Sequence, residues 1–315
     1  MKRFLTSLVL LLAAASALHA QDGRVIARLS FPLDAQLYTF LDGEIGEHFS
    51  YSLSNHWISG ADTKALYENT WRAWDSNWCD WAYIEFNTGG FSLSAGKIIM
   101  LNALQEFSAS DVDNYPILCS SHWNGITSYE LGTTASYCFE DAGITAQLQF
   151  SASPFDEKPF EGHYAVSAGL QGDFGLYKPC LAVNRCTMDE EEWGGLGKLY
   201  AVSFGNAFQV SESLLLNLDY LGRFSPSAGP STTILAGMDY SFLQDKMHLI
   251  ARAGWDYSED ELADSIEFGG EGFFGGLALE YRPVNLVRLH AAGGYNQTLG
   301  ALYDVGVSID FEFKL

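Results

Sequence analysis

The segment Tyr303-Asp-Val-Gly-Val-Ser-Ile-Asp-Phe-Glu-Phe-Lys-Leu315 decides the fold class, because apolar and polar residues alternate in it without a break. Side chains of an extended chain point alternately to opposite faces, so this segment has one apolar face and one polar face. A barrel strand with lipid outside and water inside needs this division. The segment therefore predicts the closing strand of a bacterial outer-membrane β-barrel.

The same alternation recurs along the rest of the chain. It is clear in residues 49–57, 144–152, 214–224 and 286–296, and it is weakest in 34–44 and around Lys97. Tight turns rich in Gly, Asn, Asp and Pro separate these segments alternately with longer polar links, as expected for hairpins. The longer links are expected at 58–80, 100–125, 154–162, 187–197, 225–231, 256–271 and 297–300.

This rhythm predicts an all-β fold, a transmembrane antiparallel β-barrel of about sixteen strands. The count depends on residues 24–31, whose hairpin to 35–43 would turn at Phe31-Pro-Leu-Asp34. If 24–31 is not in the wall, fourteen strands is the alternative. In a barrel of this circumference side chains cannot fill the lumen, so an aqueous channel is expected.

The start of the chain has the features of an export signal. Lys2 and Arg3 precede an apolar run from Leu8 to Leu18, and Ala20 offers a cleavage point, although Ala17 is a second choice. Residues 1–20 are therefore expected to be a signal peptide and 21–315 a single barrel domain. The rest of the sequence has no run of eighteen apolar residues that would span a membrane as a helix.

Composition restricts the classes of partner. The chain carries 17 Lys and Arg against 39 Asp and Glu, a formal charge of −22, which argues against nucleic acid and against anionic membrane surfaces. The five cysteines fit no zinc pattern. Cys180 and Cys186 are too far apart on one expected strand to bond, whereas Cys79 and Cys119 lie in expected outer loops and could pair; otherwise all five are small packing residues.

Two local stretches resemble a known family. Leu41-Asp-Gly-Glu-Ile-Gly-Glu-His-Phe-Ser-Tyr51 is similar to the opening hairpin of porins of the phosphate-selective porin O/P group. So is Trp81-Ala-Tyr-Ile-Glu-Phe86 with the following Phe91-Ser-Leu-Ser-Ala-Gly-Lys97, and the resemblance covers roughly residues 35–115. It implies a sixteen-stranded passive channel, often a homotrimer. The anion-selective members of this family have rows of Arg and Lys along their pores. This chain departs from them because it has few of either residue.

The longest link, 100–125, is the third outer loop of a sixteen-strand count, the loop that folds inward in many porins. Acidic residues of this loop facing basic residues of the wall would create a transverse field across a constriction. The acidic candidates are Glu106, Asp111 and Asp113, and the basic candidates on polar strand faces are Arg223, Arg252, Arg282 and Arg288. The alternative is that the loop packs at the mouth and the arginines pair with neighbours such as Asp239, Asp256 and Glu280.

Other clusters have weaker readings. The run Asp189, Glu190, Glu191 and Glu192 and the acidic link 256–271 could bind divalent cations that bridge to lipopolysaccharide, but solvated outer loops explain them better. The aromatic residues of 67–81 could form a sugar platform or a subunit contact, and Trp81 reads most simply as part of an interfacial girdle. His56 and His290 are expected to line the lumen.

The sequence gives no support for catalysis, since it contains neither Gly-x-Ser-x-Gly nor His-Glu-x-x-His. No cofactor is expected. The sequence thus favours an outer-membrane porin that passes small hydrophilic solutes or ions and contacts lipid and lipopolysaccharide. The alternatives are a structural or adhesive barrel acting through its loops, and a barrel enzyme with dispersed catalytic residues.

Overall fold

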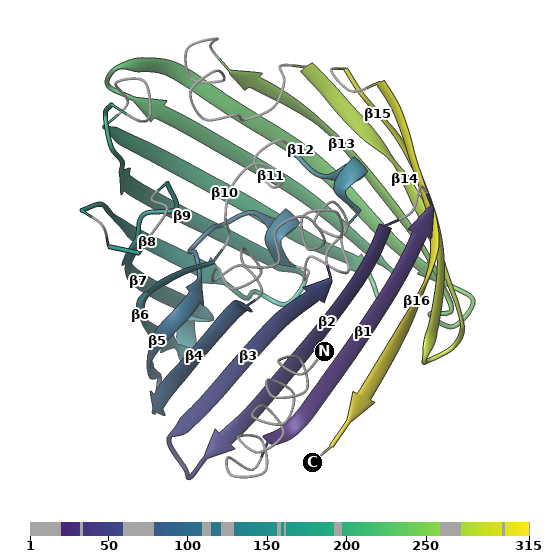
Figure 1. Ribbon diagram of the computed structural model, residues 1–315, viewed down its shortest axis with the longest axis horizontal. Helices are drawn as coiled ribbons and strands as arrows, with labels where there is room; N and C mark the ends of the chain where they lie inside the picture. Colours follow the sequence, from purple (N-terminus) through teal and green to yellow (C-terminus); the bar gives the residue numbers. More distant parts are fainter. Residues whose placement is uncertain are drawn as a thin grey trace, which may run out of the picture.

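The computed structural model describes residues 20–31, 34–58, 79–108, 115–120, 129–155, 159–160, 162–191, 197–258, 272–297 and 300–314. In this part of the chain sixteen antiparallel strands close into one barrel, each paired with its neighbours in sequence (Figure 1). The strands are β1 (Ala20–Phe31), β2 (Asp34–Ile45), β3 (Phe49–Ile58), β4 (Cys79–Thr88), β5 (Phe91–Ile99), β6 (Tyr129–Phe139), β7 (Ile144–Ala152), β8 (Tyr164–Gly172), β9 (Tyr177–Thr187), β10 (Lys198–Ser211), β11 (Leu214–Ser225), β12 (Ala228–Phe242), β13 (Met247–Ser258), β14 (Gly272–Val284), β15 (Val287–Asn296) and β16 (Gly300–Phe313).

The barrel closes where the sequence predicted it, between the first strand and the last. β1 pairs with β16 from Gly23 opposite Phe313 to Phe31 opposite Val305, which confirms the sixteen-strand count over fourteen. The register places apolar residues of both strands on one face, for example Leu29 opposite Val307. The opposite face carries ion pairs, including Arg24 with Asp310, whose Nε–Oδ1 distance is 2.8 Å.

The outer face of the barrel is an apolar belt. Leu148, Leu277 and Val305 are 65%, 56% and 51% exposed, and residues of the same parity on the other strands are exposed and apolar as well. A contiguous apolar surface of this kind is covered by lipid rather than water. In the part of the chain that the structure describes, no helix is long and apolar enough to cross a membrane.

The two ends of the barrel differ. At one end short turns connect the strands, and Gly46 and Gly143 adopt positive φ angles of 68° and 61° there, which glycine tolerates best. At the other end lie the longer connections, 59–78, 100–128, 153–163, 188–197 and 259–271. The prediction of a long link at 225–231 is wrong. β11 ends only at Ser225 and β12 begins at Ala228, and these two residues pair across a two-residue turn.

Irregular alternation has a structural cause in the two places where the sequence showed it. Tyr38 and Phe40 of β2 face inward, where their rings stack at 6.2 Å and Tyr38 packs on the buried Ile26 of β1. Lys97 shares a face with the exposed Ile99, and its Nζ reaches back to the carbonyl of Cys79 at 2.6 Å. A long cationic side chain can thus place its charge away from lipid while its carbons cover the wall.

Trp81 does not belong to an outer girdle. The register sets it opposite Ser54, on the inner face, where Nε1 donates to Ser52 Oγ at 2.8 Å and the ring contacts Phe40 at 5.7 Å. The disulfide considered between Cys79 and Cys119 is also absent, since all five cysteines are free thiols. Cys119 is buried in the connection 100–128, and Cys79 begins β4.

Candidate functional site: the lumen and its inward loop

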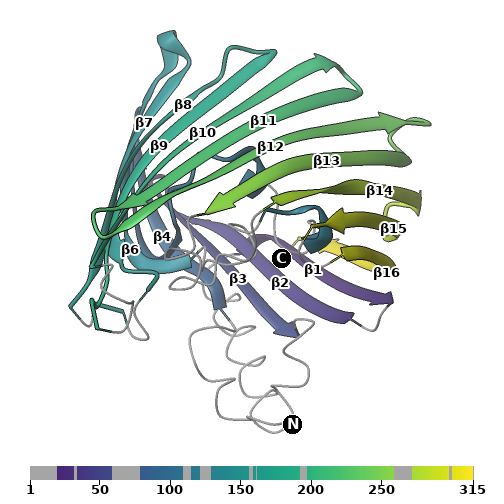
Figure 2. The same ribbon diagram turned by 90° about the horizontal axis from the view of Figure 1, so that it is seen from above.

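The connection between β5 and β6 folds into the barrel. We call residues 100–128 the long loop, its described residues 100–108 the first arm, and 115–120 the second arm. Each arm contains a short 3₁₀ turn, η3 (Gln105–Ser108) and η5 (Pro116–Leu118), and Figure 2 shows η5 inside the ring of strands, near β1 and β14–β16. The described arms of the long loop therefore lie inside the barrel.

Side chains of three strands hold the first arm. The Gln149 amide of β7 accepts from the backbone N–H of Leu101 at 2.8 Å and donates to the carbonyl of Ile99 at 2.9 Å. Further along, Ser203 Oγ of β10 accepts from the Ala103 N–H at 3.1 Å. These contacts lay the arm along the inner surface of β7–β10.

The strongest tether of the first arm is the carboxylate of Asp219 on β11. Its two oxygens accept from the backbone N–H groups of Gln105 and Glu106, each at 2.9 Å. Gly205 lies beside this tether, and a Cβ atom there would come within 2.4 Å of the Ala103 carbonyl oxygen. The absent side chain at Gly205 lets the loop backbone lie directly on the wall.

The second arm is anchored on the opposite wall. The Tyr115 hydroxyl donates to Glu280 of β14 at 2.7 Å, and its ring lies 4.8 Å from the Arg28 guanidinium carbon. Burial, followed by the negative charge of Glu280, raises the pKa of Tyr115 far above its ordinary range, so the phenol remains a donor. Leu118, only 1% exposed, packs on Ala278 and Ala292.

Glu106 joins the two arms. Its carboxylate accepts from both the backbone N–H and the hydroxyl of Ser120, each at 2.6 Å. The side chain is only 2% exposed, and burial raises its pKa to about 7, although the bonds from Ser120 and the charge of Arg252 oppose the shift. Glu106 thus lies inside the long loop rather than on its surface, and Asp111 and Asp113 lie outside the described residues.

The basic candidates all lie on β11 and β13–β15. Arg282 and Arg288 both lie 3.5 Å from carboxylate oxygens of Glu280. Arg252 donates to Cys119 Sγ of the second arm at 3.5 Å. Arg223 is buried and attracted by the Asp256 carboxylate. Glu280 and Asp256 were foreseen as neighbours of this kind, so much of the positive charge of this wall is compensated locally.

Next to Tyr115 lie two charged residues that the sequence did not single out, Arg28 and Asp304, together with the predicted lumen residue His290. Arg28 of β1 forms an ion pair with Asp304 of β16, and His290 Nε2 lies 3.4 Å from the same carboxylate. The His290 ring contacts Tyr115 at 5.4 Å, so this histidine supports the second arm. The other predicted lumen histidine, His56, pairs with Asp80 on the inner face of β3 and β4.

The acidic links form no metal centre in the described part of the chain, where no three His, Cys, Asp or Glu side chains are placed to hold an ion. Asp189 instead accepts from the Glu191 N–H at 2.8 Å, which is a local turn contact, and Glu190 is exposed. Glu192 lies outside the described residues, as do the remaining aromatic candidates of 67–78 and most of 256–271.

The residues that hold the loop were the ones that sequence reasoning missed. Gln149, Ser203 and Asp219 each lie on the polar face of an alternating strand, which is the one signal that the sequence offers for them. Their partners are backbone groups of a loop as many as 114 positions away. Alternation predicts which way these side chains point but not what they bind.

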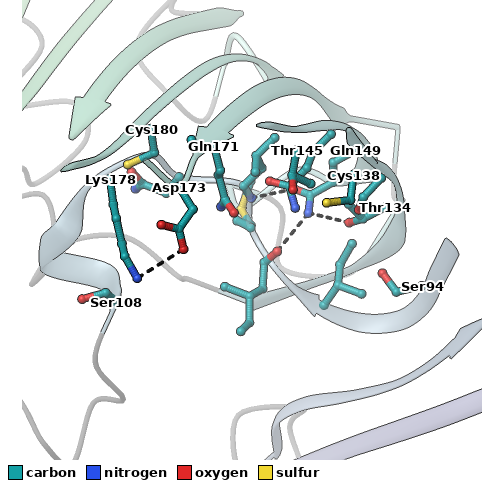
Figure 3. A pocket seen from close by; sticks show the side chains of 18 of the residues that line it. Ser94, Ser108, Thr134, Cys138, Thr145, Gln149, Gln171, Asp173, Lys178 and Cys180 are labelled. Atoms are coloured by element: carbon teal, nitrogen blue, oxygen red, sulfur yellow. Dashed lines mark hydrogen bonds and ion pairs between the residues drawn. The ribbon is translucent and has the colours of Figure 1, made fainter. Parts of the chain in front are cut away.

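Below the first arm lies a polar pocket of about 630 Å³ (Figure 3). The inner faces of β4–β9 form its wall, and the first arm covers it with Met100, Leu101, Asn102, Leu104, Gln105 and Ser108. Several uncharged hydroxyl and amide side chains line the wall: Ser94, Thr134, Ser136, Thr145, Gln147 and Gln171. The lumen is thus asymmetric, with neutral polar groups on this side and paired charges on β11 and β13–β16.

No protein-family model and no curated protein matches the sequence. Solved structures match the whole fold. A mutant of the Rh. blastica porin has a TM-score of 0.59 at 15% identity, covering 93% of this chain and 99% of that chain. A loop L8 deletion mutant of OmpT, an outer-membrane protein of Vibrio cholerae, has a TM-score of 0.60 at 10% identity, covering 92% and 98%. At these identities the likeness shows a porin-like outer-membrane barrel fold.

Proposed function

We propose that the protein is a porin of the bacterial outer membrane, a water-filled channel through which small hydrophilic solutes and ions diffuse passively. The observation that carries the proposal is the lumen itself. A closed sixteen-strand barrel is too wide for its side chains to fill, and here a polar cavity of about 630 Å³ lies beside the inward loop. The channel would then select among solutes by the width of its pore and the charge of its lining, rather than by catalytic turnover.

The long loop sets the width in this proposal. It is tethered to both walls by Asp219 and Tyr115, so it narrows the lumen instead of covering the mouth. The acidic candidates Asp111 and Asp113 and the basic candidates Arg223, Arg252, Arg282 and Arg288 are proposed to set the field at this narrowing. The third acidic candidate, Glu106, is proposed to hold the two arms together instead, because its carboxylate is buried against Ser120. Because several of these arginines are compensated by acidic neighbours, we expect weak cation preference rather than phosphate selectivity.

The setting follows from the same proposal. Residues 1–20 would be removed on export, the short turns would face the periplasm, and the apolar belt would contact lipid, with lipopolysaccharide and two further copies as candidate neighbours. We propose a relationship to the phosphate-selective porin O/P group, but not the phosphate selectivity of its members.

Swelling of proteoliposomes tests the proposal. Vesicles that contain the refolded protein should swell in isotonic solutions of small neutral solutes, with rates that fall as solute size rises. Vesicles with the protein heat-denatured before reconstitution are the control. If the folded barrel gives no more permeability than the control, the channel is refuted and a structural or adhesive barrel becomes the better account.

A further inference from the structure

The pocket below the first arm differs chemically from the rest of the lumen. On β5–β8 the inward positions are occupied mainly by serine, threonine and glutamine, as the register of these strands requires. The ion pairs of the lumen lie mostly elsewhere, on β13–β16 and β1. A solute that moves along β5–β8 therefore exchanges its water for neutral donors and acceptors.

The charges that the pocket has lie at its margin. Lys178 and Asp173 neutralise each other at 3.4 Å beside the turn between β8 and β9, and Glu85 and Glu140 line the side nearest the short turns. Figure 3 shows Lys178 and Asp173 at one end of the pocket and Ser94 and Thr134 at the other. An anion entering from the short turns would meet two carboxylates and one already paired lysine, which disfavours anion binding.

The wall offers several groups that can bind a solute at once. The Gln149 amide is used to hold the loop, and it fixes Thr134 by donating to its hydroxyl at 2.9 Å. Gln171 is exposed and brings an amide with two donors and one acceptor to the pocket, and Thr145 adds a hydroxyl. The Tyr83 ring, also in the lining, supplies an aromatic surface. Convergent polar groups with one aromatic face suit a molecule that carries both hydroxyl and C–H groups.

We infer that this pocket is a transient binding site for neutral polyhydroxylated solutes, that is, sugars and polyols, on the path through the barrel. Its volume of about 630 Å³ lies in the range of about 300–1,000 Å³ that small-molecule sites occupy. Hydroxyl groups replace water on the wall at little cost, whereas a charged solute would lose hydration without gaining an opposite charge. The inference rests on the proposed channel function and adds the class of solute to it.

Block of ion current in planar bilayers tests the inference, with maltose as the neutral probe and glucuronate as the anionic probe. Maltose should reduce the current of the wild-type channel with a saturable concentration dependence, and glucuronate should do so more weakly. Gln171→Ala and Thr145→Val should each weaken maltose block about three- to tenfold, since one hydrogen bond is worth about 0.5–1.5 kcal/mol.

Asn217→Ala is the matched control, because it removes an amide from the inner face of β11, outside the pocket. Its maltose block should equal that of the wild type. A conducting wild-type channel without saturable maltose block, or one that binds glucuronate more tightly, would overturn the inference and leave the channel intact. Equal weakening in all three variants would also overturn it. A folded protein without conductance would overturn the channel and the inference together.

Discussion

Removing the Asp219 carboxylate should release the first arm of the long loop from the wall. Two backbone N–H groups donate to it at 2.9 Å, and hydrogen bonds to a charged group are each worth about 1.5–3 kcal/mol. In Asp219→Ala, water in the lumen can bond to the freed N–H groups and restore part of this free energy, and Ser203 and Gln149 still hold the arm. We therefore expect a loss of about 2 kcal/mol, which shifts the equilibrium toward the released arm about thirtyfold.

Single-channel recording shows this shift directly. Wild-type channels should have a quiet open level, whereas Asp219→Ala should show frequent transitions among levels as the arm leaves and returns. The thermal unfolding of the barrel should change little, because the strand pairing of β11 is untouched. Asn217→Ala, two residues earlier on the same face, should behave as the wild type. Open-channel noise that is equal in Asp219→Ala and in the wild type would refute the tether.

Two further perturbations act on the same loop. The pKa of Glu106 is about 7 in the docked loop against an ordinary value of 4.5, so docking of the loop is most stable below pH 4.5 and loses about 3 kcal/mol as the pH rises past 7. Channel noise should therefore rise from pH 5 to pH 8 in the wild type and stay flat in Glu106→Gln. Noise that rises on acidification would contradict the assignment. Leu118→Ala should weaken the docking of the second arm by about 2–5 kcal/mol, since it leaves a cavity against Ala278 and Ala292. Amide hydrogen exchange of residues 115–120 should become faster, and unchanged exchange would contradict this expectation.

Alternation predicted the wall of the barrel because the fold enforces it on almost every strand. Residues 24–31, the uncertain strand of the sequence, pair with β16 as foreseen, and Tyr303–Phe313 of the alternating terminal segment lies in that closing strand. Tyr38 and Phe40 broke the pattern because aromatic side chains are acceptable on the inner face when they pack on each other and on Ile26. Such packing depends on neighbouring strands and is invisible in one strand's periodicity.

The loop shows where such reasoning ends. Its length and its place as the third outer link marked it correctly as the segment to examine, and the residues 100–108 and 115–120 lie inside the barrel. The sequence could not assign its acids, because Glu106 turns inward to Ser120 while Asp219, on a strand, takes the contacts to the loop backbone. Which carboxylate is buried depends on a meeting of segments more than a hundred residues apart.

The conductance of the refolded protein in a planar bilayer, with the reversal potential taken under a KCl gradient, tests the central claim most directly. An open lumen narrowed by a tethered loop predicts stable, ohmic steps, and an acidic chain with compensated arginines predicts a potential that leans toward cations. A correctly folded barrel that passes no current would contradict the claim.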